Sequence, residues 1–291
     1  MPYALEIRGL EKRYRNFTLG PLDLSVPPGA IYGFVGPNGS GKTTTIDLIF
    51  GMGAKDAGSI SVLGFDHVAA EVEMKRRVGY VSPELNFQPW GRVRNVIHFV
   101  RGFYPTWDAH YADDLLRAFH ITPDERILSL SFGARTKLAL VLALAWRPPV
   151  LVLDEPTTGL DAISKQQVFS ELLSAVREGD RTVFISSHAI TDLERFADHV
   201  GMIKHGRLIF EGEITEVLDR YRFVDFTVER PTEIELADHP GVLVQAKAAN
   251  RWRVLLDRSR ATIDWLKSRG ATDISDAPLT LEELFVALGR D

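Results

Sequence analysis

A glycine-rich segment that ends in lysine and threonine has the clearest chemical potential in this sequence. Residues 36–43 read GPNGSGKT, which is the Walker A pattern of phosphate-binding loops. Glycines let backbone N–H groups surround phosphate oxygens, and a following helix adds the positive end of its dipole. We expect Lys42 to reach the β- and γ-phosphates of a nucleotide and the Thr43 hydroxyl to bind Mg²⁺. The residues predicted to bind the nucleotide in this loop are Gly36, Asn38, Gly39, Ser40, Gly41, Lys42, Thr43 and Thr44.

Two adjacent acids, Asp154 and Glu155, follow the apolar run 150–153. An apolar strand that ends in such a pair is the Walker B pattern. Because neighbouring residues of a strand point to opposite faces, the two carboxylates can take different roles. Asp154 is expected to hold Mg²⁺, directly or through water, and Glu155 to polarise the attacking water as a general base.

His188 follows the apolar run 183–187. A histidine at the end of a strand is more often a structural hydrogen-bonding residue than a catalytic one. Its position beyond the acid pair nevertheless favours a contact with the γ-phosphate and with Glu155. We therefore predict that Glu155, His188 and Lys42 carry out the catalytic steps.

The elements that must position these residues follow the alternation of an α/β fold. A short apolar strand over 30–35 leads into the phosphate loop, and a helix is predicted over 42–50. The apolar runs 150–153 and 182–186 are short enough to be buried parallel strands. Strands that alternate with helices predict a doubly wound α/β core of the P-loop NTPase type. Two further strands are expected over 5–10 and 22–26.

Two other regions depart from this alternation. Residues 86–130 carry helical patterns over 93–103 and 111–119, which predict a helical insertion. After residue 218 the pattern changes again, and we predict an ATPase domain over 1–218 and a small α+β domain over 219–291. The elements expected in that second domain are strands over 223–228, 242–246 and 252–256, and helices over 261–267 and 281–288.

Composition limits the classes of partner. The chain has 291 residues with 34 basic and 39 acidic side chains, a net charge of −5. A nucleic-acid-binding protein usually carries a basic excess, so we expect no nucleic-acid partner. The absence of cysteine excludes disulfides and thiolate metal sites. The longest apolar run, 138–146, is about half of what spans a bilayer, so any membrane role is expected to depend on a partner.

Residues 130–134, Leu-Ser-Phe-Gly-Ala, complete a set of motifs that resembles the ATP-binding-cassette (ABC) ATPase family. The resemblance covers about residues 3–218. In that family the signature segment completes the ATP site of the opposite subunit, which implies that Ser131 and Gly133 contact the nucleotide in trans. Residues 158–161 resemble the D-loop, with Asp161 at the dimer interface. Tyr14 matches the aromatic residue that stacks on adenine.

The sequence departs from the family pattern in two segments. Phe132 replaces the first signature glycine, and Ala134 replaces the glutamine. Pro83 stands where the Q-loop glutamine is expected, and Glu84 follows it. Glu84 is therefore a candidate oxygen ligand for Mg²⁺.

Branch-level signals favour bacterial drug, lipid and peptide exporters, in which the ATPase and the membrane subunit are separate chains. They are the segment 103–108, Phe-Tyr-Pro-Thr-Trp-Asp, and the segment 281–285, Leu-Glu-Glu-Leu-Phe. The resemblance implies ATP and Mg²⁺ as ligands and an ATP-dependent homodimer or heterodimer. It also implies a separately encoded transmembrane permease, with this chain on the cytoplasmic side of the membrane. The alternatives are a soluble ABC ATPase without a transport role, a regulatory cassette with a degenerate site, and a P-loop kinase or GTPase.

Overall fold

A computed structural model describes residues 3–179, 181–228, 236 and 239–289. The chain forms two compact units, Met1–Glu211 and Gly212–Asp291. The boundary between these compact units does not test whether each folds as an independent domain, so the domains 1–218 and 219–291 stay a prediction.

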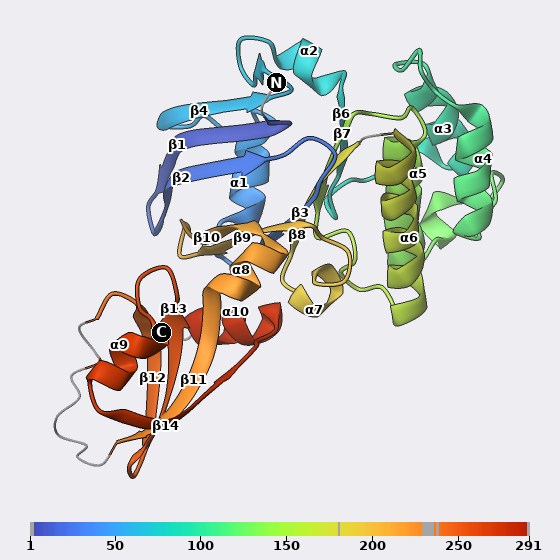
Figure 1. The fold of residues 1–291 in the computed structure, drawn as a ribbon. Coiled ribbons are helices and arrows are strands. Elements are labelled where there is room, and N and C mark those ends of the chain that lie inside the picture. Colours follow the sequence, from blue (N-terminus) through green and yellow to red (C-terminus); the bar gives the residue numbers. More distant parts are fainter. Residues whose placement is uncertain (1–2, 180, 229–235, 237–238, 290–291) are drawn as a thin grey trace. The chain divides into compact units, whose positions relative to one another are not determined.

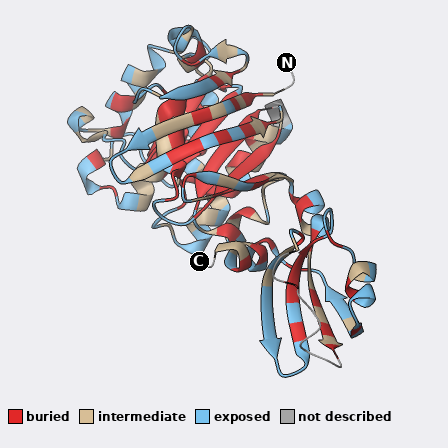
Figure 2. Ribbon diagram, turned by 90° about the vertical axis from the view of Figure 1, so that its left-hand side faces the viewer, coloured by how far each residue is buried: buried red, intermediate tan, exposed pale blue. Residues whose placement is uncertain are grey.

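The centre of the first unit is a six-stranded sheet with strand order β10-β9-β3-β8-β7-β6. The run from β9 to β6 is parallel. Every residue of β3, β7 and β8 is buried, and Figure 2 shows buried residues in red gathered in the interior of this unit. Burial on both faces explains why these strands read as continuous apolar runs. The strands are β3 Ile31–Val35, β6 Val78–Val81, β7 Val150–Asp154, β8 Thr182–Ser187, β9 His199–Lys204 and β10 Arg207–Glu213.

A second, antiparallel sheet in this unit has the order β2-β1-β4-β5. Its inward side chains share one core with helix α1 and with the six-stranded sheet, and α1 lies between the two sheets in Figure 1. The phosphate-loop helix is therefore fixed from both sides. The strands are β1 Leu5–Tyr14, β2 Phe17–Val26, β4 Ala57–Val62 and β5 Phe65–Asp66. Both β1 and β2 are longer than the strands predicted over 5–10 and 22–26.

The helices of the first unit agree with the sequence patterns in kind and differ at their ends. The apolar run 138–146 belongs mostly to α5, whose residues 137–144 are all buried in the protein. Helix α4 starts two residues before the predicted position because Asp108 caps it and accepts from the Tyr111 N–H at 2.9 Å. The helices are α1 Lys42–Ile49, α2 Glu71–Lys75, α3 Val93–Arg101, α4 Ala109–Ala118, α5 Phe132–Leu144, α6 Ala162–Gly179 and α7 Ile190–Leu193.

Helices α3 and α4 form a separate group beside α5 and α6 (Figure 1). Short 3₁₀ turns at Gln88–Trp90 and Ile127–Ser129 flank this group. The helical insertion predicted over 86–130 therefore contains the expected two helices. None of the helices in the described part of the chain combines the length and the apolar character needed to cross a membrane.

The second unit is a four-stranded antiparallel sheet with the order β12-β13-β11-β14. One face packs on α9 through a core that includes Phe226, Trp252 and Leu266. Strand β14 was not predicted, because most of its side chains are exposed and it has no apolar alternation. The elements are α8 Ile214–Arg220, β11 Tyr221–Val228, β12 Val242–Ala248, β13 Arg251–Asp257, α9 Ile263–Ser268, β14 Ala271–Ala277 and α10 Leu281–Gly289.

Candidate active site

The phosphate loop lies between β3 and α1, and two of its glycines are required by its geometry. A Cβ on Gly36 would lie 2.3 Å from the carbonyl oxygen of Ile203, so no side chain fits there. Gly41 has φ of 112°, which L-residues with side chains rarely adopt. The loop can therefore approach a ligand with its backbone, as the sequence predicts.

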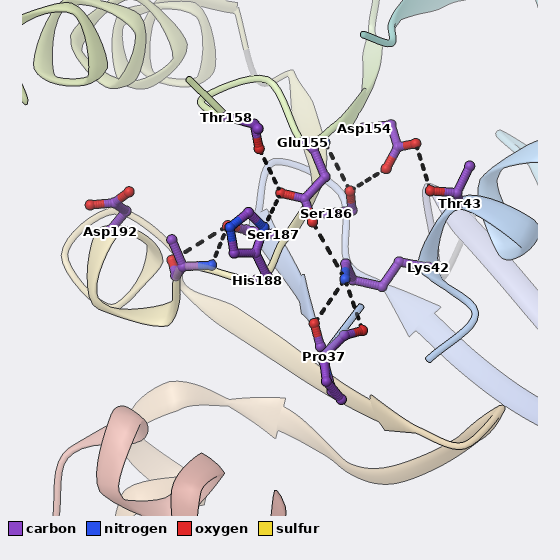
Figure 3. A network of polar contacts seen from close by, with 12 residues as sticks. Pro37, Lys42, Thr43, Asp154, Glu155, Thr158, Ser186, Ser187, His188 and Asp192 are labelled. Atoms are coloured by element: carbon purple, nitrogen blue, oxygen red, sulfur yellow. Dashed lines mark hydrogen bonds and ion pairs between the residues drawn. The ribbon is translucent and has the colours of Figure 1, made fainter. Parts of the chain in front are cut away.

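Lys42 is the first residue of α1, and its side chain turns back into the loop (Figure 3). The ammonium donates to the carbonyl oxygens of Gly36, at 2.8 Å, and Pro37, at 3.3 Å. It also lies 3.4 Å from Glu155 Oε1, although only 6% of the lysine side chain is exposed. The structure thus places a buried cation between the loop and the acid pair.

Asp154 ends β7 and is held by two hydroxyl groups. Thr43 Oγ1 donates to Asp154 Oδ2 at 3.0 Å, and Ser186 Oγ donates to Asp154 Oδ1. Burial raises the pKa of Asp154, with a smaller contribution from the charge of Glu155, while the two hydroxyl bonds oppose the rise. The Thr43 hydroxyl and the Asp154 carboxylate are hard oxygen donors of the kind that Mg²⁺ prefers.

Glu155 leaves the strand in a left-handed conformation, with φ of 46°. Its N–H donates to Ser186 Oγ at 3.0 Å, and its Oε2 accepts from Thr158 Oγ1 at 3.1 Å. Oε2 also lies 2.8 Å from His188 Nδ1. The side chains of Asp154 and Glu155 take different directions because the chain turns at Glu155, just after β7 ends at Asp154. The sequence predicts instead that they differ by alternation within the strand. Such a conformation in a residue with a side chain is often found at functional sites.

Lys42, Thr43 and Glu155 line one cavity of about 660 Å³, a volume within the roughly 300–1,000 Å³ of small-molecule sites. The buried hydroxyl of Ser40, in the same loop, has no hydrogen-bond partner among the residues that the structure describes, so the loop retains a donor. The cavity is lined by Asn16, Phe17, Asn38, Gly39, Gly41, Lys42, Thr43, Thr44, Pro83, Glu155, Thr158 and His188. A backbone cradle, the Lys42 cation and the Glu155 carboxylate, with Asp154 behind Thr43, fit a nucleoside triphosphate.

An aromatic residue that the sequence analysis did not single out, Phe17, lines this cavity. Tyr14 ends β1, is half exposed and does not line the cavity, whereas Phe17 at the start of β2 does. The two ring centroids are 6.5 Å apart. Sequence reasoning missed Phe17 and Asn16 because nothing marked the turn between β1 and β2 as a wall of the cavity. The adenine-stacking role of Tyr14 stays a prediction.

The signature residues and the D-loop aspartate lie outside this cavity. Ser131 caps α5 and accepts from the Ala134 N–H at 3.1 Å, so the helix begins at Phe132, inside the signature segment. Asp161 accepts from the Ser164 N–H at 2.9 Å, a bond that is the first cause of its lowered pKa. Gly133 is also absent from the cavity lining. The trans roles predicted for these three residues stay predictions.

Glu84 is exposed and lines a second cavity beside the start of α5, while its neighbour Pro83 lines both. The pKa of Asp47 is raised mainly by burial, then by the charge of Asp154, and then by the charge of Glu84. Glu84 is therefore near the acidic side of the site, but its proposed role as a metal ligand stays a prediction.

The fold and the site define a P-loop nucleoside triphosphatase. Residues 19–158 match the family model described as ABC transporter. The chain is 31% identical over 299 residues to the Nod factor export ATP-binding protein I of Burkholderia pseudomallei (strain 1710b), covering 99% of this chain and 97% of that protein. The chain therefore belongs to the ABC transporter ATP-binding proteins, and it is an ATPase subunit.

Two further similarities support this family. The chain is 27% identical over 285 residues to the ABC transporter ATP-binding protein YtrB of Bacillus subtilis (strain 168), covering 97% of each chain. A solved dimeric structure of the ATP-binding cassette MJ0796, described as a post-hydrolysis state bound to ADP and Pi, has a TM-score of 0.64 and 21% identity. The similarity covers 72% of this chain and 98% of that chain, and it supports the fold.

Proposed function

We propose that this protein hydrolyses ATP to drive export of a substrate through a separately encoded transmembrane subunit, on the cytoplasmic face of the membrane. Support for export comes from the relative named for Nod factor export, which this chain matches along nearly its whole length. The ATPase and the membrane subunit are then different chains, as the resemblance to the exporter branch implies.

The residues around the cavity divide the chemistry among them. Lys42 and the backbone of the phosphate loop bind the triphosphate, and the Ser40 hydroxyl adds a donor. Thr43 and Asp154 would hold Mg²⁺, which when bound neutralises phosphate charge. Glu155 orients the attacking water and accepts its proton, and His188 fixes the Glu155 carboxylate through the contact at 2.8 Å.

The second half of the site comes from another ATPase chain. Ser131 and Gly133 do not line the cavity of their own chain, so the signature is available for a nucleotide bound elsewhere. The Ser131 oxygen accepts from Ala134, which leaves its hydroxyl hydrogen free to donate to a phosphate. The N-terminus of α5 favours an anion as well. Two chains, identical or related, would pair head-to-tail around two ATP molecules, and the dimeric cassette of similar fold supports this arrangement.

The second cavity is the surface proposed for the membrane subunit. It joins the segment after β6 to the first turns of α5, next to the helical insertion. Its lining residues are Ser82, Pro83, Glu84, Leu85, Asn86, Phe87, Gln88, Phe132, Arg135, Thr136 and Ala139. A segment of the permease seated there would couple closure of the ATPase dimer to movement of the membrane helices, because binding energy shifts the populations of the two states.

The catalytic proposal depends on one observation, the orientation of the Glu155 carboxylate. Thr158 and His188 hold it, and it faces Lys42 at the mouth of the phosphate loop. A base must be oriented in this way if it is to act on water beside the γ-phosphate.

The test is Glu155→Gln in the full chain with ATP and Mg²⁺. The amide keeps the size of the side chain but cannot accept a proton, so hydrolysis should fall by about 100-fold or more. ATP binding should persist, and the variant should form a dimer with ATP in gel filtration or ultracentrifugation. Wild-type hydrolysis by the variant would refute the role of Glu155, and a strictly monomeric variant would refute the shared site.

A further inference from the structure

The first turn of α5 and the loop 156–161 interlock within one chain. A Cβ on Gly159 would lie 3.1 Å from Cδ1 and 3.2 Å from Cε1 of Phe132, so the phenylalanine ring rests on the glycine backbone. In the other direction, a Cβ on Gly133 would lie 2.7 Å from Leu160 Cδ2. Each glycine therefore makes room for a side chain of the other segment, and the two segments cannot move past one another freely.

The same phenylalanine borders the second cavity. Phe132 is 45% exposed and lines that cavity together with the segment 82–88. One ring thus contacts the loop 156–161 and also lines the surface proposed for the membrane subunit. It does not line the nucleotide cavity.

The loop 156–161 also contacts the catalytic carboxylate of Glu155. Thr158, the neighbour of Gly159, donates from Oγ1 to Glu155 Oε2 at 3.1 Å and from its N–H to the Glu155 carbonyl at 3.1 Å. The Leu160 N–H bonds to the Thr157 carbonyl at 3.2 Å, so the loop is a tight turn. A displacement of Gly159 would therefore displace the Thr158 hydroxyl that orients Glu155.

We propose that Phe132 is a positioning residue that holds the loop 156–161 so that Thr158 orients Glu155, and that it transmits occupancy of the second cavity to this carboxylate. This inference rests on the proposed function, since it takes Glu155 as the catalytic base. The bulk of the side chain contributes to the orientation of the loop, because an alanine at position 132 would leave Gly159 without this contact.

The first experiment measures ATP hydrolysis by the full chain with Phe132→Ala, Phe132→Leu and a matched control, Phe103→Ala. Phe103 is also exposed, at 63%, and lines neither cavity. Phe132→Ala should lower kcat by about fivefold and leave KM for ATP within about twofold, since only the orientation of Glu155 is impaired. Phe132→Leu should restore most of kcat, and Phe103→Ala should match the wild type. Unchanged kcat in Phe132→Ala would overturn the proposal.

A double-mutant cycle with Thr158→Val separates this route from other effects of Phe132. If Phe132 acts through Thr158, the double variant should be no slower than the slower single variant. Effects on kcat that multiply would overturn the proposal, because they would place the action of Phe132 elsewhere, such as the signature contact with a second chain. Glu155→Gln, measured alongside, keeps the two ideas distinct: a silent Phe132→Ala with an inactive Glu155→Gln refutes only the positioning role, whereas an active Glu155→Gln refutes the proposed function.

Discussion

Each of the two units buries an aspartate at the end of a strand, and the two aspartates are held in opposite ways. Asp154 and Asp257 are both only 2% exposed. Asp154 accepts from two neutral hydroxyl groups, and burial raises its pKa. Asp257 accepts from the Arg220 guanidinium at 2.9 and 2.6 Å, and that pair is the first cause of a pKa lowered to about 2.

The difference separates a residue kept for chemistry from one kept for stability. A buried carboxylate without a bound cation costs folding free energy, so such a group is expected mainly where a ligand will later supply the charge. The bidentate guanidinium on Asp257, with further bonds from the Ser259 N–H and hydroxyl, compensates the burial within the protein. Burial of Asp154 therefore lowers the stability of the first unit at its site, whereas burial of Asp257 does not destabilise the second unit.

The largest effect that tests this comparison is expected for Asp154→Asn. Loss of the carboxylate should lower hydrolysis by about 100-fold or more if Asp154 holds Mg²⁺. Because the folded-state pKa is raised, Asp154 stabilises the fold below its unfolded pKa, and this stabilisation is lost as pH rises through the folded pKa. At neutral pH without nucleotide the variant should be as stable as the wild type or more stable by about 1 kcal/mol in urea unfolding. A loss of stability would break the comparison.

Asp257→Asn should have the opposite effect, with stability reduced by about 2 kcal/mol at neutral pH. The folded-state pKa is depressed, so this stabilisation is present above the unfolded pKa near 3.8 and is lost as pH falls through about 2. The gap between the variant and the wild type in urea unfolding should therefore close over that range. The control is Asp264→Asn, whose exposed pair with Lys267 should contribute less than about 0.5 kcal/mol. An equal loss in both variants would contradict the special role of Asp257.

The smallest expected effect concerns the aromatic residue that lines the nucleotide cavity of the first unit. It tests the assignment of ligand binding to that unit. Phe17→Ala should raise KM for ATP by about threefold with little change in kcat. The ring lines the cavity, but it is uncharged and so takes no part in the reaction at the phosphates. Tyr14→Ala should have the smaller effect. The reverse order in nucleotide titrations would favour Tyr14 as the adenine-stacking residue.

Sequence alone determined the local chemistry of this protein. The spacing within residues 36–43 specifies a phosphate loop because glycine conformations and the start of a helix are set over a few residues. The apolar runs before Asp154 and before His188 predicted buried strands, and the structure contains both. The α/β core and the helical insertion followed from the same patterns. The exposed strand β14 did not, because its side chains carry no such pattern.

Only the tertiary structure decided which distant residues meet. Ser186 links Asp154 to the Glu155 backbone because β7 and β8 are neighbours in the sheet, and no local pattern marks that serine. Likewise, the sequence marks Phe132 only as a departure from a family motif, and its contact with Gly159 exists only in the tertiary structure. Strand order and packing bring such groups together, and these depend on the whole core, whereas the phosphate loop depends on a few consecutive residues.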